Sequence, residues 1–145
     1  MRGLWLSGLR IGEAAIVSWD PDAPFCVDLS GKYPRFRIYA EAQKGRRDEF
    51  LPMTPDFAEF LMQTPEDQRT GPVFTVRRLM GSVVRDADKM GPVISAIGEA
   101  AGVVVNKAEG KFASAHDLRR AFGTRWSSRV KPATLQRLMR HRSIE

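Results

Sequence analysis

Four short segments carry side chains whose types suit chemistry on a phosphate ester. Guanidinium groups can hold phosphate oxygens through paired hydrogen bonds, whereas lysine and histidine can donate or accept protons. The segments are Gly8-Leu9-Arg10-Ile11-Gly12-Glu13-Ala14, the turn at Lys44, His116-Asp117-Leu118-Arg119-Arg120, and Leu138-Met139-Arg140-His141-Arg142-Ser143-Ile144. Each segment alone has an ordinary explanation as a surface ion pair, a solvated turn or a capping histidine, so the signal lies in their combination.

The chain has a net charge of +6, and this charge is concentrated near the C-terminus. Residues 111–145 hold nine Lys or Arg and two acidic residues, a balance of +7, whereas residues 1–110 have a balance of −1. A one-sided basic surface suits nucleic acid as the partner, and a solvated basic helix without a partner is the alternative.

Taken in this order, the segments resemble the tyrosine recombinase family, which includes the phage integrases. The family pattern is an arginine in T/S-G-L-R-x-x-E, a lysine on a β-hairpin, H-x-L-R, a histidine in L-x-G-H, and then a tyrosine. The matching residues, which extend over nearly the whole chain, are Arg10, Glu13, Lys44, His116, Arg119 and His141. The segment 92–102 also resembles the helix that precedes the H-x-L-R box.

The resemblance implies an enzyme that breaks and rejoins DNA through a 3′-phosphotyrosine intermediate. Arg10 and Arg119 would clamp the scissile phosphate and stabilise the charge that builds on its oxygens in the transition state. Glu13 would orient Arg10, and His141 would donate a further hydrogen bond to the phosphate.

The resemblance also implies sites of proton transfer and of DNA contact. Lys44 would protonate the leaving 5′-oxygen, and His116 would be the base or hydrogen-bond partner of the tyrosine. Contacts to the DNA backbone are expected at Arg46, Arg47, Arg120 and Arg140, with a solvated turn as the alternative for the first two. Arg140 stands where the family commonly has glycine, and an arginine there excludes any backbone conformation that only glycine can adopt.

No cofactor and no metal ion are expected. The sequence has no cluster of acidic residues, and two histidines 25 positions apart with Cys26 distant give no zinc-binding spacing. No glycine-rich phosphate loop points to ATP, and a covalent intermediate conserves the energy of the broken bond.

The tyrosine of the family pattern is not found in the chain. It is expected about nine residues after His141, whereas Tyr33 and Tyr39 are upstream and are predicted to be packing residues. We therefore expect residues 1–145 to be a single, partial catalytic domain without the N-terminal core-binding domain and the C-terminal tyrosine segment. Such a fragment would be an inactive monomer, and the full-length protein would act as a tetramer on paired sites in double-stranded DNA.

Three other classes of function stay open on the sequence. A non-cleaving DNA-binding relic or regulator of the same fold would need the same basic face. A structural or interaction domain predicts no salt-dependent binding of duplex DNA. Type IB topoisomerases share the catalytic chemistry, but the segments match integrases better.

The predicted fold class is α+β and mainly helical, with a small antiparallel three-stranded sheet. An apolar stripe through Leu4, Leu9 and Ile16 predicts one N-terminal helix that ends at Asp20-Pro21-Asp22. Strands are predicted at 25–29, 34–40 and 49–53, with Lys44 at a hairpin tip. Helices are predicted at 54–63, 76–88, 92–101, 115–128 and 132–139, with a loop at 105–112.

The composition limits the cellular setting. No run of about 18 apolar residues is present, so no membrane-spanning helix is predicted. The single cysteine, Cys26, has no partner for an internal disulfide and is predicted to be a core residue. A cytoplasmic protein encoded by a prokaryote, a phage or another mobile element is expected.

Overall fold

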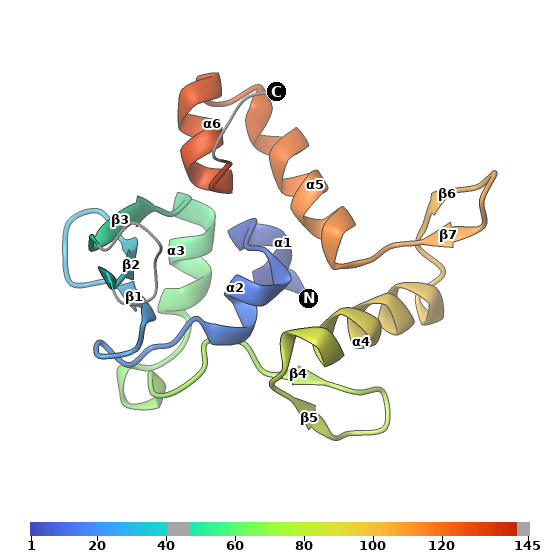
Figure 1. Cartoon of the computed structure of the whole chain (residues 1–145), viewed down its shortest axis with the longest axis horizontal. Coiled ribbons are helices and arrows are strands. Elements are labelled where there is room, and N and C mark those ends of the chain that lie inside the picture. The colour runs from blue at the N-terminus through green and yellow to red at the C-terminus, as the bar shows by residue number, and fades with distance from the viewer. Residues whose placement is uncertain (41–46, 142–145) are drawn as a thin grey trace.

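The computed structural model describes residues 1–40 and 47–141 (Figure 1). It confirms the predicted α+β class, because the chain combines helices with one three-stranded antiparallel sheet. Lys44 and Arg46 lie outside the described residues. In Figure 1 the sheet lies at the left, the two N-terminal helices lie in the centre, and the two C-terminal helices lie above them.

The N-terminal segment forms two short helices, α1 (Arg2–Ser7) and α2 (Ile11–Ile16). The prediction of one helix was wrong because Gly8 ends α1 in the left-handed conformation, with φ of 63°. A Cβ added at this position would lie 2.5 Å from the ring of Phe122, so glycine is needed for space as well as for conformation. The break leaves Arg10 at the N-cap of α2 rather than inside a helix.

The sheet contains β1 (Phe25–Asp28), β2 (Arg35–Ile38) and β3 (Glu49–Pro52), with β2 in the middle. Both pairs are antiparallel, and Phe36 lies opposite Val27 on one side and Leu51 on the other. These three residues are buried, as expected for one face of a pleated sheet that packs on the core. The predicted packing role of Tyr33 was wrong, since this residue lies before β2 and is 75% exposed.

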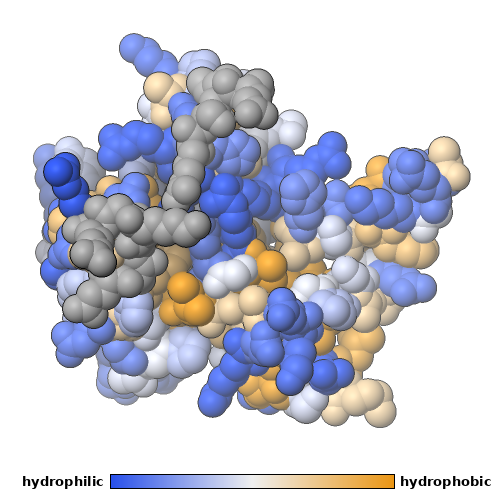
Figure 2. All heavy atoms as spheres, in the orientation of Figure 1, coloured by the Kyte–Doolittle hydropathy of each residue, from blue (hydrophilic) through white to orange (hydrophobic). Residues whose placement is uncertain are grey.

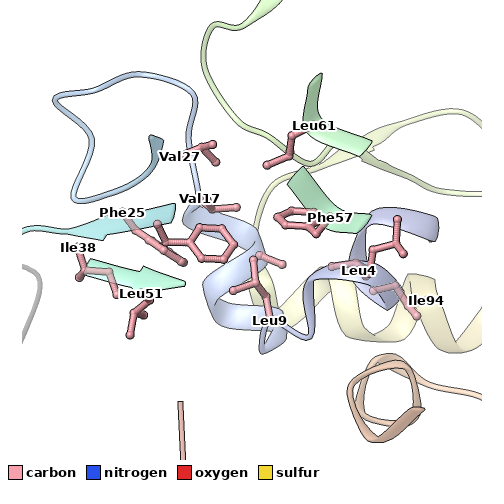
Figure 3. Close-up of a cluster of buried hydrophobic side chains, with 13 residues drawn as sticks. Leu4, Leu9, Val17, Phe25, Val27, Ile38, Leu51, Phe57, Leu61 and Ile94 are labelled. Carbon is pink, nitrogen blue, oxygen red and sulfur yellow. The ribbon is translucent and has the colours of Figure 1, made fainter. Parts of the chain in front are cut away.

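The main core joins the sheet to α1, α3 (Pro55–Met62) and α4 (Ala87–Ala100) (Figure 3). Phenylalanine rings form a chain from sheet to helix, with centroids 5.2 Å apart for Phe25 and Phe36 and 5.8 Å apart for Phe36 and Phe57. Tilted aromatic pairs at these distances add to the stability from burial alone. Cys26 is buried as predicted.

Two short hairpins were not predicted. Strands β4 (Val76–Arg77) and β5 (Val83–Val84) pair where a helix was expected, and β6 (Val104–Asn106) and β7 (Lys111–Phe112) pair where a loop was expected. Strands of two or three residues are too short for alternation to show in the sequence. A 3-10 turn (Glu66–Gln68) precedes the first of these hairpins.

Helix α4 begins earlier than the predicted start at Pro92. Asp86 caps it by accepting a hydrogen bond from the backbone N–H of Asp88, and Pro92 lies inside the helix. Within α4, Val93 and Ile94 are buried, whereas Ala101, just after its end, is exposed. An early cap therefore outweighs the tendency of proline to start a helix.

The two C-terminal helices agree closely with the predictions. Helix α5 (Ala115–Ser127) begins with a capping box between Ser114 and Asp117, and α6 (Pro132–Met139) begins at its proline. Arg125 ties α5 to the N-terminal region, because its guanidinium lies 3.7 Å from the ring centroid of Trp5.

None of the helices in the described ranges is long and apolar enough to cross a membrane.

Helix α4 approaches the start of α5 so closely that it has no room for a side chain at Gly98. A Cβ there would overlap the carbonyl oxygen of Ala113, whereas a Cβ at Gly91 on the same helix would meet nothing within 4 Å. We expect Gly98→Ala to lower the free energy of unfolding by about 1–3 kcal/mol, because backbone must move to admit the methyl group.

The matched control is Gly91→Ala, which should raise stability by up to about 1 kcal/mol through helix propensity. Urea denaturation of both variants measures the difference. Equal stabilities for the two variants would show that α4 does not pack against the backbone at Ala113.

Candidate active site

Three segments that are far apart in the sequence meet at one cluster of cationic side chains. They are the break between α1 and α2, the first half of α5, and the end of α6. The members of the cluster are Arg10, Glu13, Arg119, Arg140 and His141. On the face shown in Figure 2, hydrophilic residues gather where α5 and α6 lie, whereas apolar residues gather at the two short hairpins.

Arg10 is held at the N-terminus of α2 by Glu13. Its backbone N–H donates to Glu13 Oε2 at 2.9 Å, and its Nη1 donates to Glu13 Oε1 at 3.2 Å. The other guanidinium nitrogen, Nη2, donates to the backbone carbonyl of Arg140 at 3.0 Å. The Arg10 side chain is still 48% exposed, so it can reach a ligand from this position.

Arg119 is the buried member of the cluster, with only 7% of its surface exposed. Its Nη1 donates to the carbonyl oxygen of Gly8, and its Nη2 donates to that of Met139. Burial lowers the pKa of the Arg119 guanidinium, Arg10 and Arg140 lower this pKa further, and Glu13 opposes them. Two carbonyl oxygens satisfy hydrogen bonds but do not neutralise a charge, so the site keeps an excess of positive charge.

Arg140 ends α6 in the left-handed conformation, with φ of 51° and ψ of 43°. This conformation is uncommon for residues other than glycine but open to them, so it agrees with the prediction that the position does not require glycine. The side chain of Arg140 turns inward, where Nη1 donates to Glu13 Oε1 at 2.9 Å. The local cost of this backbone conformation is offset by bonds that the turn makes possible.

His141 follows this turn with an exposed side chain, and its backbone N–H donates to the carbonyl of Gln136 at 3.0 Å. Desolvation lowers the pKa of His141, and the positive charges of Arg119 and Arg10 lower it further. The ring is therefore neutral at neutral pH and can donate one hydrogen bond from its protonated nitrogen.

Of the remaining predicted site residues, Lys44 and Arg46 lie outside the described residues and the others are exposed. His116 is exposed in the first turn of α5, one helical turn before Arg119. Arg120 is 69% exposed and lies 3.9 Å from Asp117, and Arg47 is exposed. Hydrogen bonds thus bring Arg10, Glu13, Arg119 and Arg140 to one place, and His141 lies near enough for the charges of Arg119 and Arg10 to lower its pKa. Among the described residues, no hydrogen bond joins His116, Arg120 or Arg47 to this cluster.

The sequence analysis missed the functional groups that hold the arginines. These groups are the backbone carbonyls of Gly8, Met139 and Arg140. Every residue has a carbonyl, so no residue type or spacing could identify them. Within residues 1–40 and 47–141, no three His, Cys, Asp or Glu side chains gather to hold a metal ion.

The cluster can bind an anion with several oxygen atoms. Three guanidinium groups and one carboxylate lie within one hydrogen-bonded network, so an anion would relieve the repulsion among the cations. The exposed guanidinium of Arg10 and the neutral ring of His141 are the groups that can turn toward such a ligand.

The comparisons with known proteins bear on the fold. No family model matches this sequence, and no curated protein is similar to it in sequence. Among solved structures, the chain is similar to the crystal structure of XerA recombinase, with 20% sequence identity and a TM-score of 0.57. The similarity covers 97% of this chain and 47% of that one, so the chain spans about half the length of XerA recombinase. The chain therefore has the fold of a tyrosine recombinase.

Proposed function

We propose that this chain is part of the catalytic domain of a site-specific DNA recombinase or integrase. The observation that carries the proposal is the meeting of Arg10, Arg119 and His141 at one site within a recombinase fold. These residues come from three segments whose order along the chain matches the family pattern. Double-stranded DNA is the proposed substrate, and no cofactor is proposed.

The reaction proposed is attack by a tyrosine hydroxyl on a phosphodiester, with a free 5′-hydroxyl as the leaving group. Negative charge builds on the phosphate oxygens in the transition state, and Arg10 and Arg119 stabilise it from preorganised positions. Arg119 needs no movement, because two carbonyl oxygens already fix its plane. His141 donates a further hydrogen bond to the same phosphate.

Proton transfer is assigned to the residues that the family pattern implies. His116 assists the attacking tyrosine, and Lys44 delivers a proton to the leaving oxygen. Tyr39 donates its hydroxyl to the carbonyl of Pro21, so it is not proposed as the nucleophile. We propose that the nucleophile is a tyrosine about nine residues after His141, so residues 1–145 alone would not cleave DNA.

The DNA backbone is proposed to contact Arg46, Arg47 and Arg120. Active protein is proposed to be a tetramer on paired DNA sites, and residues 1–145 alone to be a monomer. The cytoplasm of a prokaryote is the setting that such an activity implies.

Binding of duplex DNA by this chain should depend steeply on salt. With about four phosphates contacted, affinity should fall by about 100-fold between 50 and 200 mM salt, because each contact releases a counterion. Fluorescence anisotropy with a labelled duplex measures this slope. Arg120→Ala should reduce the slope, whereas Arg77→Ala on the β4–β5 hairpin should not. Affinity independent of salt would support an interaction domain instead.

Cleavage should require Arg10 in a form of the protein that carries the downstream tyrosine. Arg10→Ala should slow formation of the covalent protein–DNA complex by at least about 100-fold, because one donor to the transition state is lost. Duplex binding should be retained, since other cations contact the backbone. The complex is measured on denaturing gels, with Arg77→Ala as the control. A normal rate of complex formation in Arg10→Ala would show that Arg10 does not stabilise the transition state.

The pKa of His141 should lie below the ordinary histidine value of about 6.5 in the free protein and rise when DNA binds. Desolvation, and then the charges of Arg119 and Arg10, disfavour the protonated ring, and a bound phosphate offsets the charge of the arginines. The complex therefore takes up a proton between the two pKa values, and affinity increases as the pH falls through that window. An NMR titration measures both pKa values, with His141→Gln to assign the signal. The same pKa with and without DNA would exclude His141 from the phosphate site.

A further inference from the structure

We propose that Arg140 is a positioning residue that neutralises Glu13 and so leaves the charge of Arg10 available to phosphate. This inference rests on the proposed function and assigns Arg140 a role other than contact with the DNA backbone. It is carried by the conformation at the end of α6 and by the bonds that the backbone and the side chain of this residue make.

The backbone at Arg140 turns two consecutive carbonyl groups toward the guanidinium groups of Arg10 and Arg119. Among the described residues, Arg140 is the single non-glycine residue with a positive φ. The carbonyl of Met139 accepts from Arg119, and the carbonyl of Arg140 accepts from Arg10. Carbonyls at the end of a helix have no hydrogen-bond partner within the helix. This turn directs two of them, which would otherwise bind water, toward Arg10 and Arg119.

The side chain of Arg140 returns to the same place from the other direction. Its Nη1 lies 2.9 Å from Glu13 Oε1, closer than Nη1 of Arg10, which lies 3.2 Å from the same oxygen. The guanidinium also lies 5.7 Å from the ring centroid of Phe25 and is more buried than that of Arg10. Arg140 is thus the inner partner of the carboxylate, and Arg10 is the outer one.

This arrangement decides how much charge Arg10 can offer. With Arg10 as its one partner, Glu13 would orient the guanidinium but also cancel its charge toward an approaching anion. Because Arg140 shares the carboxylate, Glu13 can hold Arg10 in place without neutralising it. If Arg140 acts in this way, phosphate binding needs it only while the carboxylate of Glu13 is present. If Arg140 contacts phosphate directly, binding needs it whether or not that carboxylate is present.

The test uses residues 1–145 and inorganic phosphate at constant ionic strength, with binding followed through the NMR signals of the His141 ring. Arg140→Gly removes the side chain and keeps access to the left-handed conformation, so the turn at the end of α6 should be retained. Phosphate affinity should fall by at least about tenfold, because Glu13 then pairs with Arg10 alone. A melting curve of Arg140→Gly separates this loss from unfolding.

The deciding variant is Glu13→Gln combined with Arg140→Gly. If Arg140 acts through the carboxylate, adding Glu13→Gln to Arg140→Gly restores much of the phosphate affinity, because no negative charge is left to cancel the charge of Arg10. If Arg140 contacts phosphate itself, Arg140→Gly weakens binding equally in the natural chain and in the Glu13→Gln variant, and the proposal is overturned. Unchanged affinity in Arg140→Gly overturns it as well. If the natural chain does not bind phosphate, the proposed phosphate site at Arg10 and Arg119 is overturned, and the proposed function with it.

Discussion

The arrangement of this domain depends on the hydrogen bonds that the buried guanidinium of Arg119 donates. This guanidinium lies on α5 and joins the carbonyl of Gly8, at the end of α1, to the carbonyl of Met139, at the end of α6. A buried cation without these acceptors would be strongly destabilising. The first and last helices of the described chain are therefore fixed relative to each other by the same group that would hold a phosphate.

This geometry leaves electrostatic repulsion within the site. Arg10 and Arg140 share the carboxylate of Glu13, whereas Arg119 bonds to carbonyl oxygens. Burial, and then the neighbouring cations, lower the pKa values of both Arg119 and His141. Carbonyl oxygens satisfy the hydrogen-bond donors without removing the charge. An anion placed among these cations would reduce their repulsion and so stabilise the fold.

Two residues in the left-handed conformation make these contacts geometrically possible. Gly8 turns the chain between α1 and α2, so that its own carbonyl points to α5 and Arg10 begins the next helix. Arg140 makes the corresponding turn at the end of α6. The two short hairpins and the sheet are not part of this network of bonds, although the sheet supplies Phe25, over which Arg140 lies.

The sequence by itself determined the α+β class, the three-stranded sheet and the two C-terminal helices, and it singled out the residues on which the proposed phosphate site rests. These features follow from local signals, which are capping residues, alternation along strands, and residue types in a recognisable order. Tertiary structure alone decided the break at Gly8, the two short hairpins, the early start of α4 and the inward turn of Arg140. Each of these depends on contacts between distant segments, such as the ring of Phe122 beside Gly8 and Glu13 beside Arg140. Such contacts outweigh local propensity because they involve backbone groups and buried charges, whose partners no spacing along the chain can reveal.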